Sequence, residues 1–306
     1  MGICEASGMR HLPGSVLIGL ATILWGTTGT TQEFAPEAST PLTIGAMRLV
    51  VAAIVLMLIA GFSGHLGRLT GMRRPATLLA AVGVAAYQPF FFLAVDRTGV
   101  VVGTIVAIGS APVFAGLLAW ALDRAAPSRL WGTATAVALA GVALLVASGH
   151  DVGTSAAGIA YALGAGAAYA TYVIAARQFS RDGNVIGSTA IIFAIAAVLL
   201  LPLLASGDLG WVATLPGTVT VLHLGVLATA AAYLLFAAGL QSTRSTTATT
   251  LSLGEPMTAA LLGVIAVGER PTLLGWIGFG LVLVALTAVA TEGRSNRFVP
   301  SRTPAS

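Results

Sequence analysis

The sequence predicts an all-α integral membrane protein with ten transmembrane helices, and three observations lead to this fold class. Charged residues make up 8% of the chain and hydrophobic residues 57%, whereas an ordinary soluble domain carries about 25% charged residues. This number of charges is too small to cover the surface of a 306-residue protein in water. Lipid must therefore surround most of the chain. The 37 glycines fit the same class, because small residues let helices pack closely in a membrane. The third observation is a regular series of long apolar segments.

Ten such segments each have about the 20 residues of helix that crossing the hydrocarbon core requires. Short connectors between them hold nearly all of the charge and many of the turn-forming residues. The expected spans lie near residues 13–34, 42–61, 75–95, 99–122, 129–148, 157–177, 185–205, 217–239, 245–267 and 272–291.

Arginines in the connectors predict the orientation. With a cytoplasmic N-terminus, twelve arginines fall on the inner side and only Arg97 and Arg270 on the outer side, in agreement with the excess of basic residues in cytoplasmic loops. Arg48 lies inside the second span. Both termini are therefore expected to be cytoplasmic, as an N-terminal segment over 1–12 and a disordered tail over 292–306. The inner arginines are Arg10, Arg68, Arg73, Arg74, Arg124, Arg129, Arg177, Arg181, Arg244, Arg294, Arg297 and Arg302.

Two pairs of prolines indicate an internal repeat. Pro112 and Pro256 are 144 residues apart (256 − 112), and the same offset relates Pro127 to Pro271 without a gap. The chain is therefore expected to consist of two five-helix halves. Because five is odd, the second half enters the membrane from the opposite side, an arrangement that places a binding site near the midplane between the halves. The expected halves are residues 13–148 and 157–291.

Several of these segments resemble the drug/metabolite transporter superfamily and, within it, the EamA-type ten-helix transporters. The resemblance covers residues 14 to 290 approximately and implies export of small metabolites, amino acids or drugs. One departure is Asp123-Arg124, which stands where the first half of the family often carries Gly-Glu. The matching stretches include ATILWGTT, AMRLVVAA, IVAIGSAPVFAGLLA and LSLGEPMTAALLGVIAVGERPTLLGWIGFGLVLVAL.

Glu255 is the acidic residue that most needs an explanation. It lies about ten residues into the ninth span, hence roughly 15 Å deep, where an ionisable group costs on the order of 3 kcal/mol and usually marks a cavity or a relay. One interpretation is a site that couples transport to protons or binds a substrate ammonium. The other is a structural hydrogen bond to carbonyls that Pro256 leaves unpaired. Because the equivalent site reads Ala111-Pro112, a proline alone does not require the acid.

Arg48 and a set of aromatic and polar residues complete the candidate site. Arg48 could pair with a substrate carboxylate or a nearby acid, or it could reach toward the outer interface. The other members lie well inside their spans, where they could line a midplane pocket or simply pack against neighbouring helices. Pro112 and Pro256 are expected to kink the fourth and ninth spans, which we expect to be moving elements. The pocket candidates are Trp25, Thr28, Tyr87, Gln88, Tyr169, Tyr172 and Tyr233.

The remaining patterns narrow the function. The sequence holds no His-Glu-x-x-His and no Walker loop, so neither an intramembrane metalloenzyme nor ATP-driven transport is expected. One cysteine, four scattered histidines and no basic helix predict no metal, no cofactor and no nucleic-acid partner. The predicted function is therefore a secondary transporter of the cell inner membrane that exports a small organic solute by alternating access, with proton coupling left open. An uncoupled facilitator, an importer and a non-transporting membrane sensor are the alternatives. The expected partners are a small-molecule solute, membrane lipid and, for a coupled mechanism, protons; no oligomeric state follows from the sequence.

Overall fold

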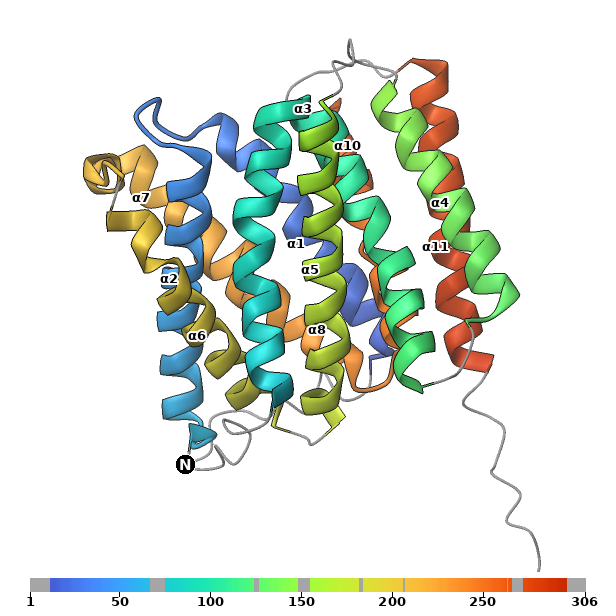
Figure 1. The fold of residues 1–306 in the computed structure, drawn as a ribbon, viewed down its shortest axis with the longest axis horizontal. Coiled ribbons are helices and arrows are strands. Elements are labelled where there is room, and N and C mark those ends of the chain that lie inside the picture. Colours follow the sequence, from blue (N-terminus) through green and yellow to red (C-terminus); the bar gives the residue numbers. More distant parts are fainter. Residues whose placement is uncertain are drawn as a thin grey trace, which may run out of the picture.

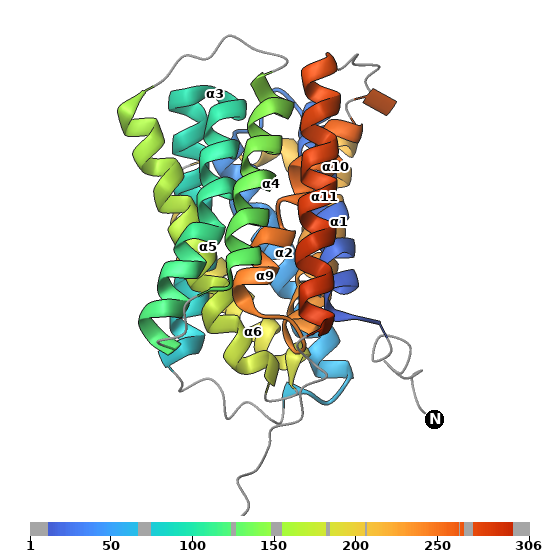
Figure 2. The same ribbon diagram turned by 90° about the vertical axis from the view of Figure 1, so that its right-hand side faces the viewer.

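The computed structural model is a bundle of helices, seen from two sides in Figures 1 and 2. Throughout the described residues, every regular element is a helix. Six helical stretches are long and apolar enough to cross a membrane, while Val106–Leu122 and Arg129–Leu144 are shorter apolar helices. The six are Pro41–Phe62, Pro75–Ala94, Ala156–Gln178, Val185–Ala205, Leu215–Leu240 and Leu273–Thr291. The structure describes residues 12–66, 75–123, 127–147, 155–181, 184–205, 207–262, 264–265 and 272–295.

The first two helices, α1 (Gly14–Glu33) and α2 (Pro41–Phe62), match the first two expected spans closely. The start of α2 is fixed by a capping box, in which Thr40 Oγ1 accepts from the Thr43 backbone N–H and Thr43 Oγ1 accepts from the Thr40 backbone N–H. These bonds satisfy backbone donors that would otherwise have no partner at a helix start.

The third and fourth expected spans form one helix, α3 (Pro75–Asp123), of 49 residues. A straight helix of this length would measure about 74 Å, more than twice the hydrocarbon thickness of about 30 Å. Figure 1 shows how the molecule avoids this: α3 folds back at one end of the bundle, so that its two arms run side by side. The residues of the fold-back are therefore helical where the sequence suggested a connector.

The helices α4 (Arg129–Ala147), α5 (Ala156–Arg181), α6 (Val185–Ala205) and α11 (Leu273–Ser295) complete the outer parts of the bundle. In Figure 1, α2 lies against α6 at one edge and α4 against α11 at the other, while α5 packs on both arms of α3. In both views, α1 begins and α11 ends at the same end of the bundle.

The eighth expected span is helical throughout but changes from α-helix to π-helix and back to α-helix. It consists of α7 (Leu215–Leu222), the π-helix η4 (His223–Ala231) and α8 (Ala232–Leu240), and a short 3₁₀ turn, η3 (Gly210–Ala213), precedes it. A π-helix of nine residues is rare, and such segments occur frequently at functional sites. No sequence signal indicated this change.

The ninth expected span is broken. The helix α9 (Ser245–Leu251) ends in a turn at Ser252 and Leu253, and α10 (Gly254–Leu262) starts immediately after it. Pro256 therefore stands in the first turn of a new helix, where its missing N–H leaves no helical bond unmade. The expected kink at Pro256 takes the form of a complete interruption just before it. At Pro112, by contrast, α3 is continuous.

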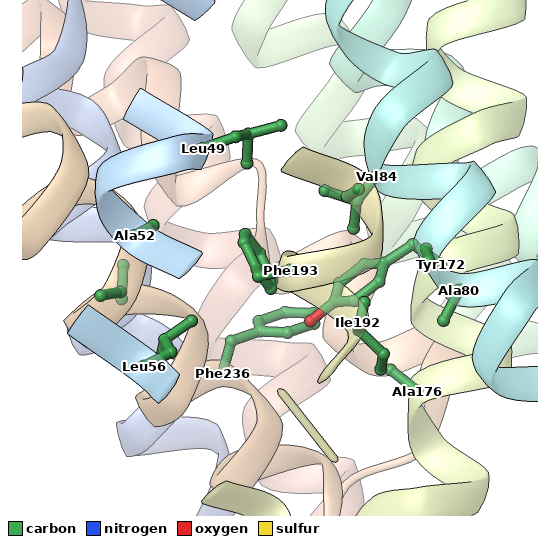
Figure 3. Packing of buried hydrophobic residues seen from close by; sticks show 14 of the residues in the cluster. Leu49, Ala52, Leu56, Ala80, Val84, Tyr172, Ala176, Ile192, Phe193 and Phe236 are labelled. Carbon is green, nitrogen blue, oxygen red and sulfur yellow. The ribbon is translucent and has the colours of Figure 1, made fainter. Parts of the chain in front are cut away.

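The interior is apolar, and so is much of the exterior. Leu49, Phe193 and Phe236 belong to a buried cluster that joins α2, α3, α5, α6 and α8 (Figure 3). On the outside, large side chains such as Leu58 and Leu283 are about half exposed. Apolar surface of this extent would be unstable in water, so these faces contact lipid.

The C-terminal helix extends further than the sequence predicted. The helix α11 continues to Ser295, four residues into the segment that was expected to be disordered, because continuing the helix pairs backbone groups that would otherwise need other partners. The rest of that tail, 296–306, and most of the N-terminal segment, 1–11, lie outside the described residues. So do Glu269 and Arg270 of the outer loop.

The close approach of α4 to α11 leads to a stability prediction. A Cβ atom at Gly141 would lie 2.7 Å from the Gly278 carbonyl oxygen and 2.9 Å from the Val282 backbone nitrogen, whereas a Cβ at Gly132 of the same helix would meet open space. Overpacking typically costs about 1–3 kcal/mol, so we expect Gly141→Ala to lower the Tm of the purified protein by several degrees. Gly132→Ala should leave Tm unchanged or raise it, and equal values for the two variants would contradict this packing.

Candidate functional site

Side chains from seven helical segments and one turn enclose a cavity inside the bundle. Its volume is about 40 Å³, which is space for about three water molecules. The lining residues are Trp25 and Thr28 of α1, Arg48 of α2, Tyr87 and Ile108 on the two arms of α3, Tyr169 of α5, Ala228 of η4, Tyr233 of α8, Ser252 in the turn, and Glu255 of α10.

Glu255 is placed in the cavity by the broken helix. Its backbone N–H donates to the Ser252 carbonyl across the turn (3.0 Å), which puts its side chain in the first turn of α10. A negative charge is stabilised at a helix N-terminus, where backbone N–H groups are unpaired. Among the described residues, no side chain donates a hydrogen bond to this carboxylate or forms an ion pair with it. The Glu255 side chain thus lines the cavity without a hydrogen-bond partner among the described residues.

Arg48 is the positive counterpart of Glu255 in the cavity. One of its terminal nitrogens, Nη2, donates to Gln88 Oε1 (3.1 Å), while its Nε is buried with no partner in the described part of the chain. Gln88 is 3% exposed and does not line the cavity, so it positions Arg48 from behind. Gly45 lies close to Gln88 and Phe92, because a Cβ there would clash with the Phe92 ring and come within 3.2 Å of Gln88 Oε1.

Four of the ten lining residues are aromatic, and the ring of Trp25 contacts two of the others. Its ring centroid lies 5.0 Å from that of Tyr233 and 6.2 Å from that of Tyr169, the latter at 83°. Edge-to-face contacts of this kind are favourable because the positive ring edge meets the negative ring face. Trp25 is 6% exposed, and its indole N–H finds no acceptor within the described residues. Tyr87 completes the wall and stacks on Phe91 at 5.5 Å.

Tyr169 links α5 to the break in the ninth span. Its hydroxyl is hydrogen-bonded to Ser252 Oγ (2.7 Å), and Ser252 Oγ donates to the Ala248 carbonyl (3.0 Å). Tyr172, one turn further along α5, is fully buried behind the cavity and packs against Tyr233 (5.5 Å between centroids). It therefore supports the wall without lining it.

The structure brings together seven of the nine expected binding residues and places Gln88 and Tyr172 behind them. It adds Ile108, Ala228 and Ser252, which sequence reasoning missed because isoleucine, alanine and serine are common in any membrane helix. A signal did exist for two of them, since Ile108 and Ser252 are themselves 144 residues apart (252 − 108). In the described part of the chain, no three His, Cys, Asp or Glu side chains are grouped as metal ligands would be.

The hydrogen bond between Tyr169 and Ser252 can be tested with a double-mutant cycle. Ser252→Ala leaves the buried tyrosine hydroxyl without its partner, while Tyr169→Phe removes that hydroxyl, so the two effects should not add. We expect a coupling free energy of about 1 kcal/mol, measured from denaturant unfolding in mixed micelles. Strictly additive effects would mean that this bond does not hold α5 to the break.

Comparison with known proteins places the chain in a family. The model of the EamA-like transporter family matches residues 12–147 and again residues 156–291. The uncharacterized transporter YwfM of Bacillus subtilis is 42% identical over 283 residues, which cover 92% of this chain and 95% of that protein. The uncharacterized inner membrane transporter YicL of Salmonella typhimurium is 24% identical and covers 92% of this chain and 96% of its own length. The threonine/homoserine exporter RhtA of Escherichia coli is 29% identical and covers 88% of each chain.

A solved crystal structure shows the same fold. It superposes with a TM-score of 0.78 over 92% of this chain and 98% of the other at 19% identity. Together with the many apolar helices, these relatives identify a multi-pass protein of the inner membrane. The chain belongs to the EamA-like transporter family, within the drug/metabolite transporter superfamily.

Proposed function

We propose that the chain is a secondary transporter that exports a small organic solute through the cavity between its helices. The observation that carries this proposal is that a carboxylate, Glu255, and an arginine, Arg48, line one cavity together with four aromatic side chains. Ionisable residues at such depth usually mark a substrate or ion pathway. The relationship to exporters of threonine and homoserine supports both the outward direction and a solute of amino-acid size.

The proposed architecture is a pair of inverted five-helix halves with both termini in the cytoplasm. Two features support it besides the double family match. Helices that hold the same position in the two halves contact each other: the second spans, α2 and α6, and the fifth spans, α4 and α11. The cavity is also lined by two pairs of residues at the repeat offset of 144, Trp25 with Tyr169 and Ile108 with Ser252. A site between the halves is what alternating access requires.

The proposed moving elements are the interrupted ninth span and the π-helix. The turn at Ser252 and Leu253 separates α9 from α10, so each half-helix can tilt without stretching a continuous ladder of hydrogen bonds. In η4, Thr229 Oγ1 donates to the Leu224 carbonyl five residues earlier (2.7 Å), which gives that bulge a local partner. We assign no hinge to Pro112, because α3 is continuous through it.

An access route from the outer side is proposed between α1 and α7. A second cavity of about 580 Å³ opens there, lined by Thr27, Thr30 and Thr31 of α1 and by Thr220 of α7, among others. Thr27 Oγ1 is hydrogen-bonded to His223 Nε2 (2.9 Å) at its margin. We propose that separating this pair joins the outer cavity to the inner one.

Flux measurements test the function directly. The protein is reconstituted in liposomes and loaded with labelled amino acids, polyamines, nucleosides or cationic drugs chosen from a thermal-stability screen, in which a ligand of the folded form raises Tm. Flux that responds to a pH gradient supports a coupled exporter. Flux indifferent to that gradient would indicate an uncoupled facilitator, and binding without flux would indicate a sensor.

The role of Glu255 has its own prediction. If this carboxylate takes up and releases the coupling proton, Glu255→Gln should fold normally but lose the pH dependence of transport, because the amide cannot ionise. Initial rates in liposomes with and without an imposed pH gradient measure this. Glu37→Gln, at an exposed position between α1 and α2, is the matched control. Unchanged pH-driven flux in Glu255→Gln would return Glu255 to a structural role.

A further inference from the structure

Two buried hydrogen-bond donors, both on side chains that line the cavity, have no partner in the described residues. They are the indole Nε1–H of Trp25 and the Nε–H of Arg48. An unsatisfied buried donor costs about 1–3 kcal/mol, so its presence in a native structure requires an explanation. Both donors belong to side chains that line the same small cavity, and in that cavity the one side chain with a negative charge is Glu255.

The lack of a partner for Trp25 follows from a difference between the two repeats. At the repeat offset, Trp25 corresponds to Tyr169 and Ile108 corresponds to Ser252. Tyr169 and Ser252 satisfy each other through a hydrogen bond of 2.7 Å. The side chain of Ile108 has no acceptor atom, so the equivalent pair leaves the indole N–H free.

We propose that Trp25 Nε1 and Arg48 bind the carboxylate of the solute while Glu255 binds its ammonium, so that the cavity selects zwitterionic amino acids and rejects amines without a carboxylate. This inference rests on the proposed function of the cavity as the solute site. A carboxylate is the acceptor that suits these donors, because an arginine and an indole N–H together supply one positive charge and several N–H groups. When a zwitterion is bound, Arg48 and Glu255 each face a group of opposite charge. The indole N–H of Trp25 and the Nε–H of Arg48 then each have an acceptor.

A cationic amine would not complete the site. It could pair with Glu255, but it would leave the indole N–H unpaired and would bring a positive charge toward Arg48. A site built to hydrogen-bond one group strongly disfavours an analogue that lacks this group, because its own polar atoms then stay unpaired. Selectivity against polyamines and cationic drugs therefore resides in Trp25 and Arg48, whereas Glu255 alone would accept them.

Binding to the purified protein tests the proposal without any need for transport. The probes are the twenty proteinogenic amino acids, each compared with the amine that lacks its carboxylate, for example L-serine with ethanolamine. Isothermal titration and Tm shifts give the Kd values. We expect at least one amino acid to bind more than tenfold tighter than its amine. Amines that bind as tightly as their amino acids, or a failure of all twenty amino acids to bind, would overturn the carboxylate subsite.

Variants at two positions assign the effect to the indole N–H. Trp25→Phe keeps an aromatic ring but removes the donor, and it should weaken amino-acid binding at least tenfold. Trp211→Phe is the matched control, because Trp211 is buried with an equally unpartnered N–H in the described residues but does not line the cavity. Unchanged affinity in Trp25→Phe would contradict the proposal.

A second pair of variants covers the case in which Trp25→Phe does not fold. Ile108→Thr and Ile108→Val differ only in that a hydroxyl replaces a methyl group, and the hydroxyl offers Trp25 an internal acceptor. We expect Ile108→Thr to bind the amino acid more weakly than Ile108→Val, and equal affinities would contradict the proposal. Flux of a carboxylate-free solute in liposomes would refute this subsite yet leave the proposed transport function intact.

Discussion

The structure depends on one constraint: inside the hydrocarbon region every backbone group must find its partner within the protein. A broken helix can exist there only if it is enclosed, and all seven residues of α9 are buried. A neighbouring side chain also bonds to this helix, because Trp131 donates its indole N–H to the Thr246 carbonyl (3.0 Å). The interruption that presents Glu255 to the cavity is thus maintained by the helices around it.

Hydroxyl groups are the means by which this polar helix is accommodated. Thr249 and Ser252 donate to carbonyls of α9 itself, and Thr250 is hydrogen-bonded to Thr135 of α4 (2.9 Å). Such bonds are the usual polar contacts between membrane helices. Together with the bond between Tyr169 and Ser252, they attach the segment before the break to α4 and α5. Among its described residues, the charged half-helix after the break has fewer such contacts, so motion is expected on that side.

The sequence predicted the class, the family and most of the cavity residues because these leave strong signals: apolar length, and charge or aromatic rings far from any interface. It did not predict the backbone irregularities. The residues of the fold-back within α3 are themselves helical, so no long connector marks it in the sequence, and the π-helix η4 consists largely of ordinary apolar residues. Gln88 and Tyr172 were expected in the cavity because polarity and helix face do not distinguish the wall from the layer behind it.

The position of the two charges connects the fold to the proposed mechanism. Arg48 comes from the first half of the chain and Glu255 from the second, on helices that the proposed rocking motion moves relative to each other. The protein therefore binds a solute that contacts both residues most tightly at one relative position of the halves and less tightly at others. Binding then favours the closed cavity, and separation of the halves releases the solute. A single charge on one half would bind the solute equally in every state, and a ligand that binds all states equally shifts none of them.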